Sequence, residues 1–257
     1  MTIGIALALG GVIGVLLGLL GGGGSILAVP ALVYVLGLRI GQAIPMSLIV
    51  IGIASAVGAA PKVIAHQVQW RLAAIFAATG IPATFLGTVI GTHLPQPVLL
   101  IGFALLMVVA GVRMLQDKGD TGTACTVGDN GINWRRCAPR SLPAGFVVGL
   151  LTGLFGVGGG FLIIPALVLM LGVEMPIAIG TSLLIIVANS AAGVVSHLDG
   201  AAIDWSITTA FVGTAIVGSL LAGHHGTKLD TNRLQRWFAY LVFVVAAYVL
   251  IDTIFLH

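Results

Sequence analysis

The stretch Gly18-Leu-Leu-Gly-Gly-Gly-Gly-Ser-Ile-Leu-Ala-Val-Pro-Ala-Leu-Val33 decides the fold of this chain, because it occurs twice. It returns as Gly153-Leu-Phe-Gly-Val-Gly-Gly-Gly-Phe-Leu-Ile-Ile-Pro-Ala-Leu-Val168, at an offset of 135 residues. Aligned without gaps, Gly18 to Gly58 and Gly153 to Gly193 are identical at 20 of 41 positions. The chain is therefore an internal duplication, and each repeat fills about half of it.

The composition points to a membrane. Hydrophobic residues make up 58% of the chain and charged residues 7%, whereas about 25% of the residues in a soluble domain are charged. The apolar runs are continuous rather than alternating, which favours helices over strands. Several are long enough to cross a bilayer, so we expect an all-α polytopic membrane protein. The runs lie at about 3–20, 25–37, 42–61, 69–92, 97–115, 141–155, 160–172, 176–196, 205–225 and 231–254.

These runs divide the chain into a first membrane repeat (1–115), a polar linker (116–140) and a second membrane repeat (141–257). The second run of each repeat would form a helix only about 20 Å long, too short for a hydrocarbon core of about 30 Å. We expect it to form a re-entrant hairpin with the run before it, broken at the glycines. Three transmembrane helices then complete each repeat.

The distribution of Lys and Arg predicts the orientation, because cations in short loops stay cytoplasmic. If the repeats have inverted topology and the linker lies inside, ten of the eleven cations are cytoplasmic and Arg39 lies outside. The ten are Lys62, Arg71, Arg113, Lys118, Arg135, Arg136, Arg140, Lys228, Arg233 and Arg236. If the repeats were parallel, seven would lie inside and four outside. We therefore predict inverted-topology repeats in the inner (plasma) membrane, with a cytoplasmic linker and both termini extracytoplasmic.

The contiguous glycines are the first candidate binding residues. A glycine costs a helix up to about 1 kcal/mol relative to alanine, so an unbroken helix is disfavoured there. The freed backbone groups must face protein or a watery cavity, and the half-helices that follow begin with N–H groups that favour anions. The alternative is close helix packing through small residues. The candidates are Gly21, Gly22, Gly23, Gly24 and Ser25, and in the second repeat Gly158, Gly159 and Gly160.

Four further polar residues could bind an anion. Ser47 and Ser182 are equivalent in the two repeats, and Thr181 adjoins the second. Asn189 lies deeper in its span and is equivalent to Ala54, so it breaks the symmetry as an asymmetric substrate would require. The alternatives are a serine bonded to its own helix backbone and an asparagine bonded across helices.

Other chemistries find little support. No charged residue falls in the middle of a predicted span, so a carboxylate proton carrier is not expected, and Lys62 at a span end is explained by orientation. Cys125 and Cys137 are expected to be unpaired linker thiols. We expect no enzyme, cofactor, metal or nucleic-acid role. The expected partners are a small anionic substrate and the lipid bilayer, and the oligomeric state is left open, a homodimer included.

Three of these motifs resemble the TauE/SafE family of sulfite exporters. They are Gly153 to Leu167, Ile179-Gly-Thr-Ser-Leu183, and His197-Leu-Asp-Gly-Ala-Ala-Ile-Asp-Trp205. The resemblance implies transport of sulfite or a small organosulfur anion such as a sulfonate. The residues themselves indicate a secondary transporter that alternates access around the glycine loops, and the alternative is an anion channel with a similar Gly-loop pore.

Overall fold

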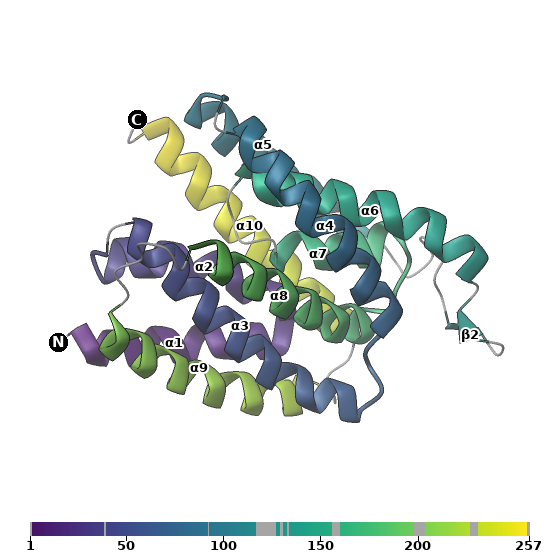
Figure 1. Ribbon diagram of the computed structural model, residues 1–257, viewed down its shortest axis with the longest axis horizontal. Helices are drawn as coiled ribbons and strands as arrows, with labels where there is room; N and C mark the ends of the chain where they lie inside the picture. The colour runs from purple at the N-terminus through teal and green to yellow at the C-terminus, as the bar shows by residue number, and fades with distance from the viewer. Residues whose placement is uncertain are drawn as a thin grey trace.

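The computed structural model describes residues 2–38, 40–91, 93–116, 127–128, 131–132, 134–155, 160–197, 204–226 and 231–255, and these are almost entirely helical (Figure 1). The first repeat contains α1 (Thr2–Leu20), a 3₁₀ turn (Gly21–Gly24), α2 (Ser25–Pro30), a π-helical turn (Ala31–Val35), α3 (Ile40–Ile64), α4 (Trp70–Gly91) and α5 (Gln96–Gln116). The second contains α6 (Trp134–Phe155), α7 (Gly160–Pro165), a π-helical turn (Ala166–Met170), α8 (Met175–His197), α9 (Trp205–Gly226) and α10 (Thr231–Phe255).

The expected helical, multi-pass membrane architecture is confirmed. Among the described residues, five helices are long and apolar enough to cross a bilayer. They are α3, α4, α6, α8 and α9, through the spans Pro45–Ile64, Trp70–Gly87, Cys137–Leu154, Met175–Val194 and Trp205–Gly223. Large apolar side chains such as Phe85 and Val244 are 58% and 68% exposed, as lipid-facing side chains should be.

Two details of the linker region differ from expectation. The helix α6 begins at Trp134, within the segment assigned to the polar linker. The preceding part contains a small antiparallel pair of strands, β1 (Val127–Gly128) and β2 (Gly131–Ile132). The three arginines before residue 141 concealed the start of α6, because they interrupt the apolar run without interrupting the helix.

The predicted short helices are present in both repeats and end alike. Each has six residues of α-helix and then five of π-helix, about 16 Å in all at 1.5 Å per residue. Pro30 and Pro165 stand where the hydrogen-bond pattern changes, because a proline lacks the N–H that would continue the α-helical ladder. Gly37 and Gly172 then end the segment at φ +69° and +67°, a conformation that glycine adopts without strain.

The two repeats exchange helices. The first helix of each repeat packs along the fourth helix of the other, α1 on α9 and α6 on α4. A Cβ at Gly10 would lie 3.2 Å from the Cα of Phe211, and a Cβ at Gly145 would lie 3.2 Å from the Cα of Phe76. Both contacts stand at the repeat offset from each other, so the two interfaces are copies of one arrangement.

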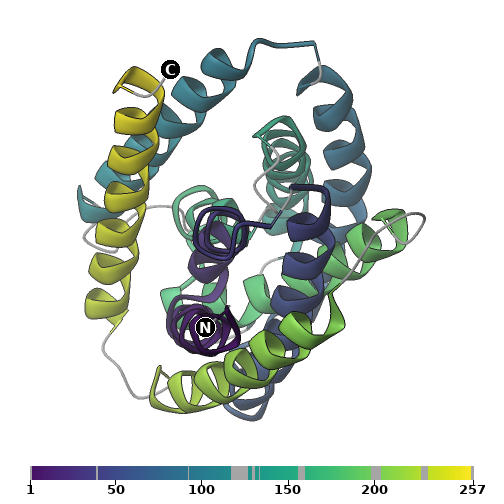
Figure 2. The ribbon, with the colours of Figure 1, turned by 90° about the vertical axis from the view of Figure 1, so that its left-hand side faces the viewer.

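The equivalent helices α3 and α8 pack against each other at the centre of the protein. A Cβ at Gly52 would lie 3.0 Å from the Cβ of Ser190, and a Cβ at Gly193 would lie 2.9 Å from Leu48. Residue numbers fall along one helix as they rise along the other, so the two helices run antiparallel. The last helices, α5 and α10, also pack together and form one side of the molecule (Figure 2).

Candidate functional site

The first glycine loop turns the chain back on itself. Gly21 has φ +58°, which ends α1. Three residues later, a Cβ at Gly24 would lie 2.8 Å from the Ile13 carbonyl oxygen and 2.8 Å from Leu17, both in α1. In a continuous helix Ile13 would be about 16 Å away from Gly24. The 3₁₀ turn Gly21–Gly24, which includes Gly23, therefore directs the chain back toward α1.

The two glycine motifs meet in space. A Cβ at Gly22 would collide with the carbonyl of Gly160, and one at Gly160 would collide with the Ser25 hydroxyl. A Cβ at Gly21 would lie 2.7 Å from the Oγ of Ser182 on α8. We call these five residues, Gly21, Gly22, Ser25, Gly160 and Ser182, the glycine cluster. Such close backbone approach is available to glycine alone.

The cluster lies beside the centre of the repeat symmetry. Ser25 and Gly160 are equivalent positions, separated by the repeat offset of 135, and they contact each other. Equivalent positions can touch only where the two repeats come together about their common axis. Residues from both halves therefore contribute to one location, as the sequence predicted for the two loops.

The cluster hydroxyls donate to their own backbone in this structure. The Oγ of Ser25 donates to the Gly22 carbonyl at 2.6 Å, and the Oγ of Ser182 donates to the Ile179 carbonyl at 2.8 Å. Each hydroxyl keeps acceptor lone pairs. Both serine hydroxyls are therefore bonded to their own backbone. To donate to an anion, each hydroxyl would have to rotate away from its carbonyl acceptor.

Thr181 and Ser47 lie elsewhere on the same helix pair. The Oγ1 of Thr181 accepts the backbone N–H of Gln69 at 3.0 Å, which fixes the loop between α3 and α4 onto the start of α8. Ser47 is the eighth residue of α3 and is 2% exposed. Gly24 faces α1 rather than the cluster. Gly158 and Gly159 fall outside the described residues.

Asn189 follows the cluster along α8. Ser182, Ile186 and Asn189 share one face at spacings of four and three residues, and Ile186 lies 3.0 Å from the Cβ position of Gly160. The Oδ1 of Asn189 is buried and has no hydrogen-bond partner among the described residues. Buried polar atoms in native proteins are almost always paired, so this oxygen stands ready to accept a donor such as water or a ligand hydroxyl.

Three other buried polar groups have no hydrogen-bond partner among the described residues. They are the Oγ of Ser55, equivalent to Ser190, and the Nζ of Lys62, both on α3, and the Oε1 of Gln67 in the loop that follows, and none of the three was among the residues predicted to bind substrate. Lys62 is 0% exposed, although the sequence indicated only an orientation role. Its spacing of seven residues from Ser55 puts both side chains on one helix face, and this spacing is the sequence pattern that could have identified them together.

The linker thiols differ from expectation. Cys137 is disulfide-bonded and 0% exposed, so the prediction of an unpaired thiol is wrong at this position. Cys125 falls outside the described residues. In the described ranges, no three His, Cys, Asp or Glu side chains come together as metal ligands would.

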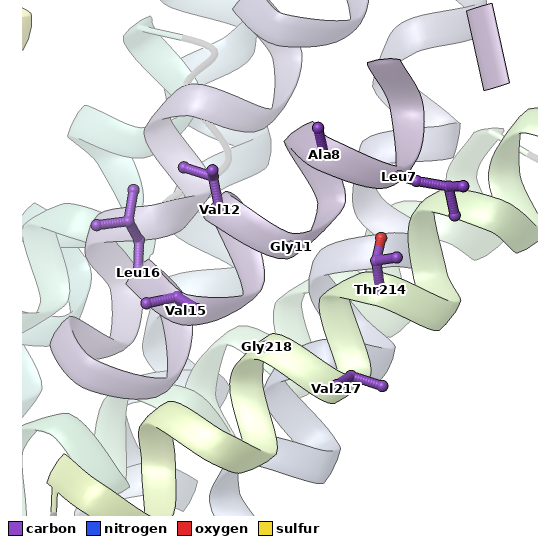
Figure 3. Close-up of a pocket in the computed structure, with 9 residues that line it drawn as sticks. All are labelled: Leu7, Ala8, Gly11, Val12, Val15, Leu16, Thr214, Val217 and Gly218. Carbon is purple, nitrogen blue, oxygen red and sulfur yellow. The ribbon is translucent and has the colours of Figure 1, made fainter. Parts of the chain in front are cut away.

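An apolar groove on the outer surface is separate from this site (Figure 3). It has a volume of about 560 Å³ and lies between α1 and α9, where Val12 and Val217 are 55% and 57% exposed. Thr214 alone among its lining residues has a polar side chain, so the groove suits lipid chains rather than an anion. The lining residues are Leu7, Ala8, Gly11, Val12, Val15, Leu16, Thr214, Val217 and Gly218.

Comparison with known proteins agrees with this architecture. The family model described as "Sulfite exporter TauE/SafE" matches residues 6–249. A "Probable membrane transporter protein" of Xylella fastidiosa (strain Temecula1) is 37% identical over 96% of this chain and 94% of its own length. "Probable membrane transporter protein YunE" of Bacillus subtilis is 25% identical over 99% of this chain and 100% of its own length. No solved structure matches the chain.

Proposed function

Since the chain is a membrane transporter of the sulfite exporter TauE/SafE family, we propose that it moves sulfite or a small organosulfonate anion across the cytoplasmic membrane by alternating access. The observation that carries this proposal is the contact between Gly22 of one repeat and Gly160 of the other. That contact supports a single site built from both repeats, as in repeat-built transporters whose broken helices meet around the substrate.

The site offers mainly neutral hydrogen-bonding groups, and these suit an oxyanion. Glycine backbone can approach a ligand closely because no Cβ intervenes. Main-chain N–H groups and the Asn189 amide can donate to sulfur oxygens, while the unpaired Oδ1 of Asn189 can accept from a hydrogensulfite hydroxyl or a retained water. Asn189 has Ala54 as its equivalent, so a substrate would be oriented toward the second repeat.

We further propose that the repeats have inverted topology. Antiparallel packing of the equivalent helices α3 and α8 supports this arrangement, because two helices related by a two-fold axis parallel to them would run in the same direction. The α1–α2 and α6–α7 hairpins would then enter the bilayer from opposite sides. Rocking one hairpin with its partner helix against the other would expose the cluster to each side in turn.

For orientation, we propose a cytoplasmic linker with both termini outside. Ten of the eleven Lys and Arg residues agree with this placement. The disulfide at Cys137 points the other way, because disulfides persist mainly in oxidising compartments. We base the proposed orientation on the Lys and Arg residues, because ten positions agree with a cytoplasmic linker.

Binding and counterflow measurements test the proposed function. Purified protein should bind sulfite or methanesulfonate more tightly than acetate or chloride, measured by calorimetry across pH and sodium concentration. In proteoliposomes, labelled sulfite should accumulate transiently against an excess of unlabelled sulfite inside. Flux that neither saturates nor counterflows would replace the transporter with an anion channel, and tighter binding of carboxylates would replace the sulfur substrate.

A further inference from the structure

A buried cation on α3 is not used by the proposed site. Lys62 lies two residues before the end of α3 and is 0% exposed, and its Nζ has no hydrogen-bond partner in the part of the chain that the structure describes. A lysine near the end of a membrane helix ordinarily extends its ammonium to the interface. The ammonium of Lys62 is instead enclosed by protein.

The inner face of α3 carries Lys62. Ser55, Ala59 and Lys62 recur at spacings of four and three residues, and they are 0%, 2% and 0% exposed. Ile53 and Ile64, on the opposite face, are 40% and 80% exposed. The Oγ of Ser55 is also buried and finds no partner within the described ranges, so Ser55 and Lys62 place two such polar groups along one interior stripe of the helix.

Lys62 lies within about one helical turn of the depth of the glycine cluster. The antiparallel pairing of α3 with α8 brings Gly58 to 3.9 Å from Leu183, measured from a Cβ at Gly58 to the leucine Cδ1. Lys62 is one turn further along α3 and Ser182 is one residue earlier on α8. Because the helices are antiparallel, Lys62 lies three residues, about 4.5 Å, beyond the level of Ser182.

A second set of contacts also places the end of α3 that bears Lys62 near the glycine loop. A Cβ at Gly18, in the last turn of α1, would lie 2.8 Å from the backbone nitrogen of Gly223 on α9. A Cβ at Gly223 in turn would lie 3.6 Å from Pro61, the neighbour of Lys62. The glycine loop that begins at Gly21 thus starts beside the end of α3 that bears Lys62.

The described surroundings of Lys62 supply no counter-charge. Glu174, before α8, and Asp204, before α9, are both exposed, and the Oδ1 of Asp204 accepts the backbone N–H groups of Ser206 and Ile207 at 3.0 and 3.2 Å. Gln67 donates its backbone N–H to the Lys62 carbonyl at 2.8 Å, and its side-chain Oε1 is itself unpaired.

We propose that Lys62 is the cationic group that binds the transported anion at the entrance to the glycine cluster, with the Ser55 hydroxyl as a second donor further in. This inference rests on the proposed function. An enclosed ammonium without a counter-ion is unfavourable, and a mobile anion would provide that counter-ion. The ammonium also supplies three donors and a full positive charge, which the cluster serines, already bonded to backbone, do not supply.

The test compares Lys62→Met and Lys62→Arg with wild type, and with Arg113→Gln, which removes an exposed cation from the last turn of α5. Sulfite, methanesulfonate, phosphate, acetate and chloride are the probes, and the readouts are affinity and thermal unfolding of purified protein. Lys62→Met should weaken binding of every anion that wild type binds by roughly tenfold or more, the loss of one charged hydrogen bond. Lys62→Arg should bind within severalfold of wild type, and Arg113→Gln should match it.

The unfolding temperatures separate binding from a structural role. Without anion, Lys62→Met should unfold at a higher temperature than wild type, because an unpaired buried charge has gone, and added anion should no longer raise that temperature. Unchanged affinity in Lys62→Met, or a lowered unfolding temperature without anion, would overturn the role of Lys62. If wild type binds phosphate or acetate through Lys62 but neither sulfur anion, the proposed substrate fails and the inference stands.

Discussion

The outer helix pairs, α1 with α9 and α4 with α6, keep the symmetry of the duplication, whereas the centre of the protein departs from it. At the outer pairs, Gly10 meets Phe211 and Gly145 meets Phe76 at the same 3.2 Å separation from Cβ position to Cα. At the centre, Ser25 opposes Gly160, and Asn189 stands where the first repeat has Ala54. Symmetry is kept at these outer packing contacts, and at the centre it is lost at Ser25 and at Asn189. The difference separates positions that hold the fold from positions that could hold a substrate.

We expect the largest mutational effect at the glycine cluster. In Gly22→Val, the new side chain would collide with the Gly160 carbonyl, and backbone cannot yield as a side-chain end can. We expect substrate binding to be lost in purified protein while membrane insertion persists. Gly213→Val is the matched control, because a Cβ there has nothing within 4 Å. Binding retained in Gly22→Val would remove Gly22 from the site.

The symmetric interfaces predict a pair of equal effects. A Cβ at Gly14 would collide with the Ala215 carbonyl, and a Cβ at its equivalent Gly149 would collide with the Gly80 carbonyl. Gly14→Val and Gly149→Val should each lower stability by about 1–3 kcal/mol, the usual cost of overpacking. Thermal unfolding in detergent measures both. A large difference between the two variants would mean that the interfaces are not equivalent.

A smaller effect is expected from the asymmetric asparagine. Asn189→Ala should weaken anion affinity by about 1 kcal/mol, roughly fivefold, the typical value of one hydrogen bond. Ala54→Ser, which alters the equivalent position, should change affinity less. Isothermal titration of both variants gives the comparison, and equal small effects would return Asn189 to a packing role.

The smallest effect should come from the disulfide. Cys137 lies in the first turn of α6, away from the glycine cluster at the far end of that helix. Cys137→Ser should therefore leave anion affinity within about twofold of wild type. Alkylation of acid-quenched cells with a maleimide of high mass, before and after reduction, measures whether the bond exists in the cell. A bond that is oxidised there would argue for an extracytoplasmic linker.

The sequence predicted the repeats, the short helices after each glycine loop and the meeting of those loops, because glycine, proline and a fixed offset leave local marks. It did not predict that α1 packs on α9, since nothing local says which repeat a helix will join. It also did not predict that Lys62 is enclosed by protein. A lysine near a helix end looks the same in sequence whether it reaches outward or is enclosed, and only the arrangement of α3 against α8 and α9 distinguishes the two.

The exchange of helices between repeats also governs how the chain can assemble. A polypeptide that stopped at the end of α5 would have α1 without α9 and α4 without α6, two long apolar faces with no partner. These faces therefore remain unpaired in the bilayer until the second half is synthesised, unless they pack against a second copy of the chain. Joining both halves in one polypeptide keeps the missing partner at a high effective concentration, so completion does not depend on a chance encounter between chains.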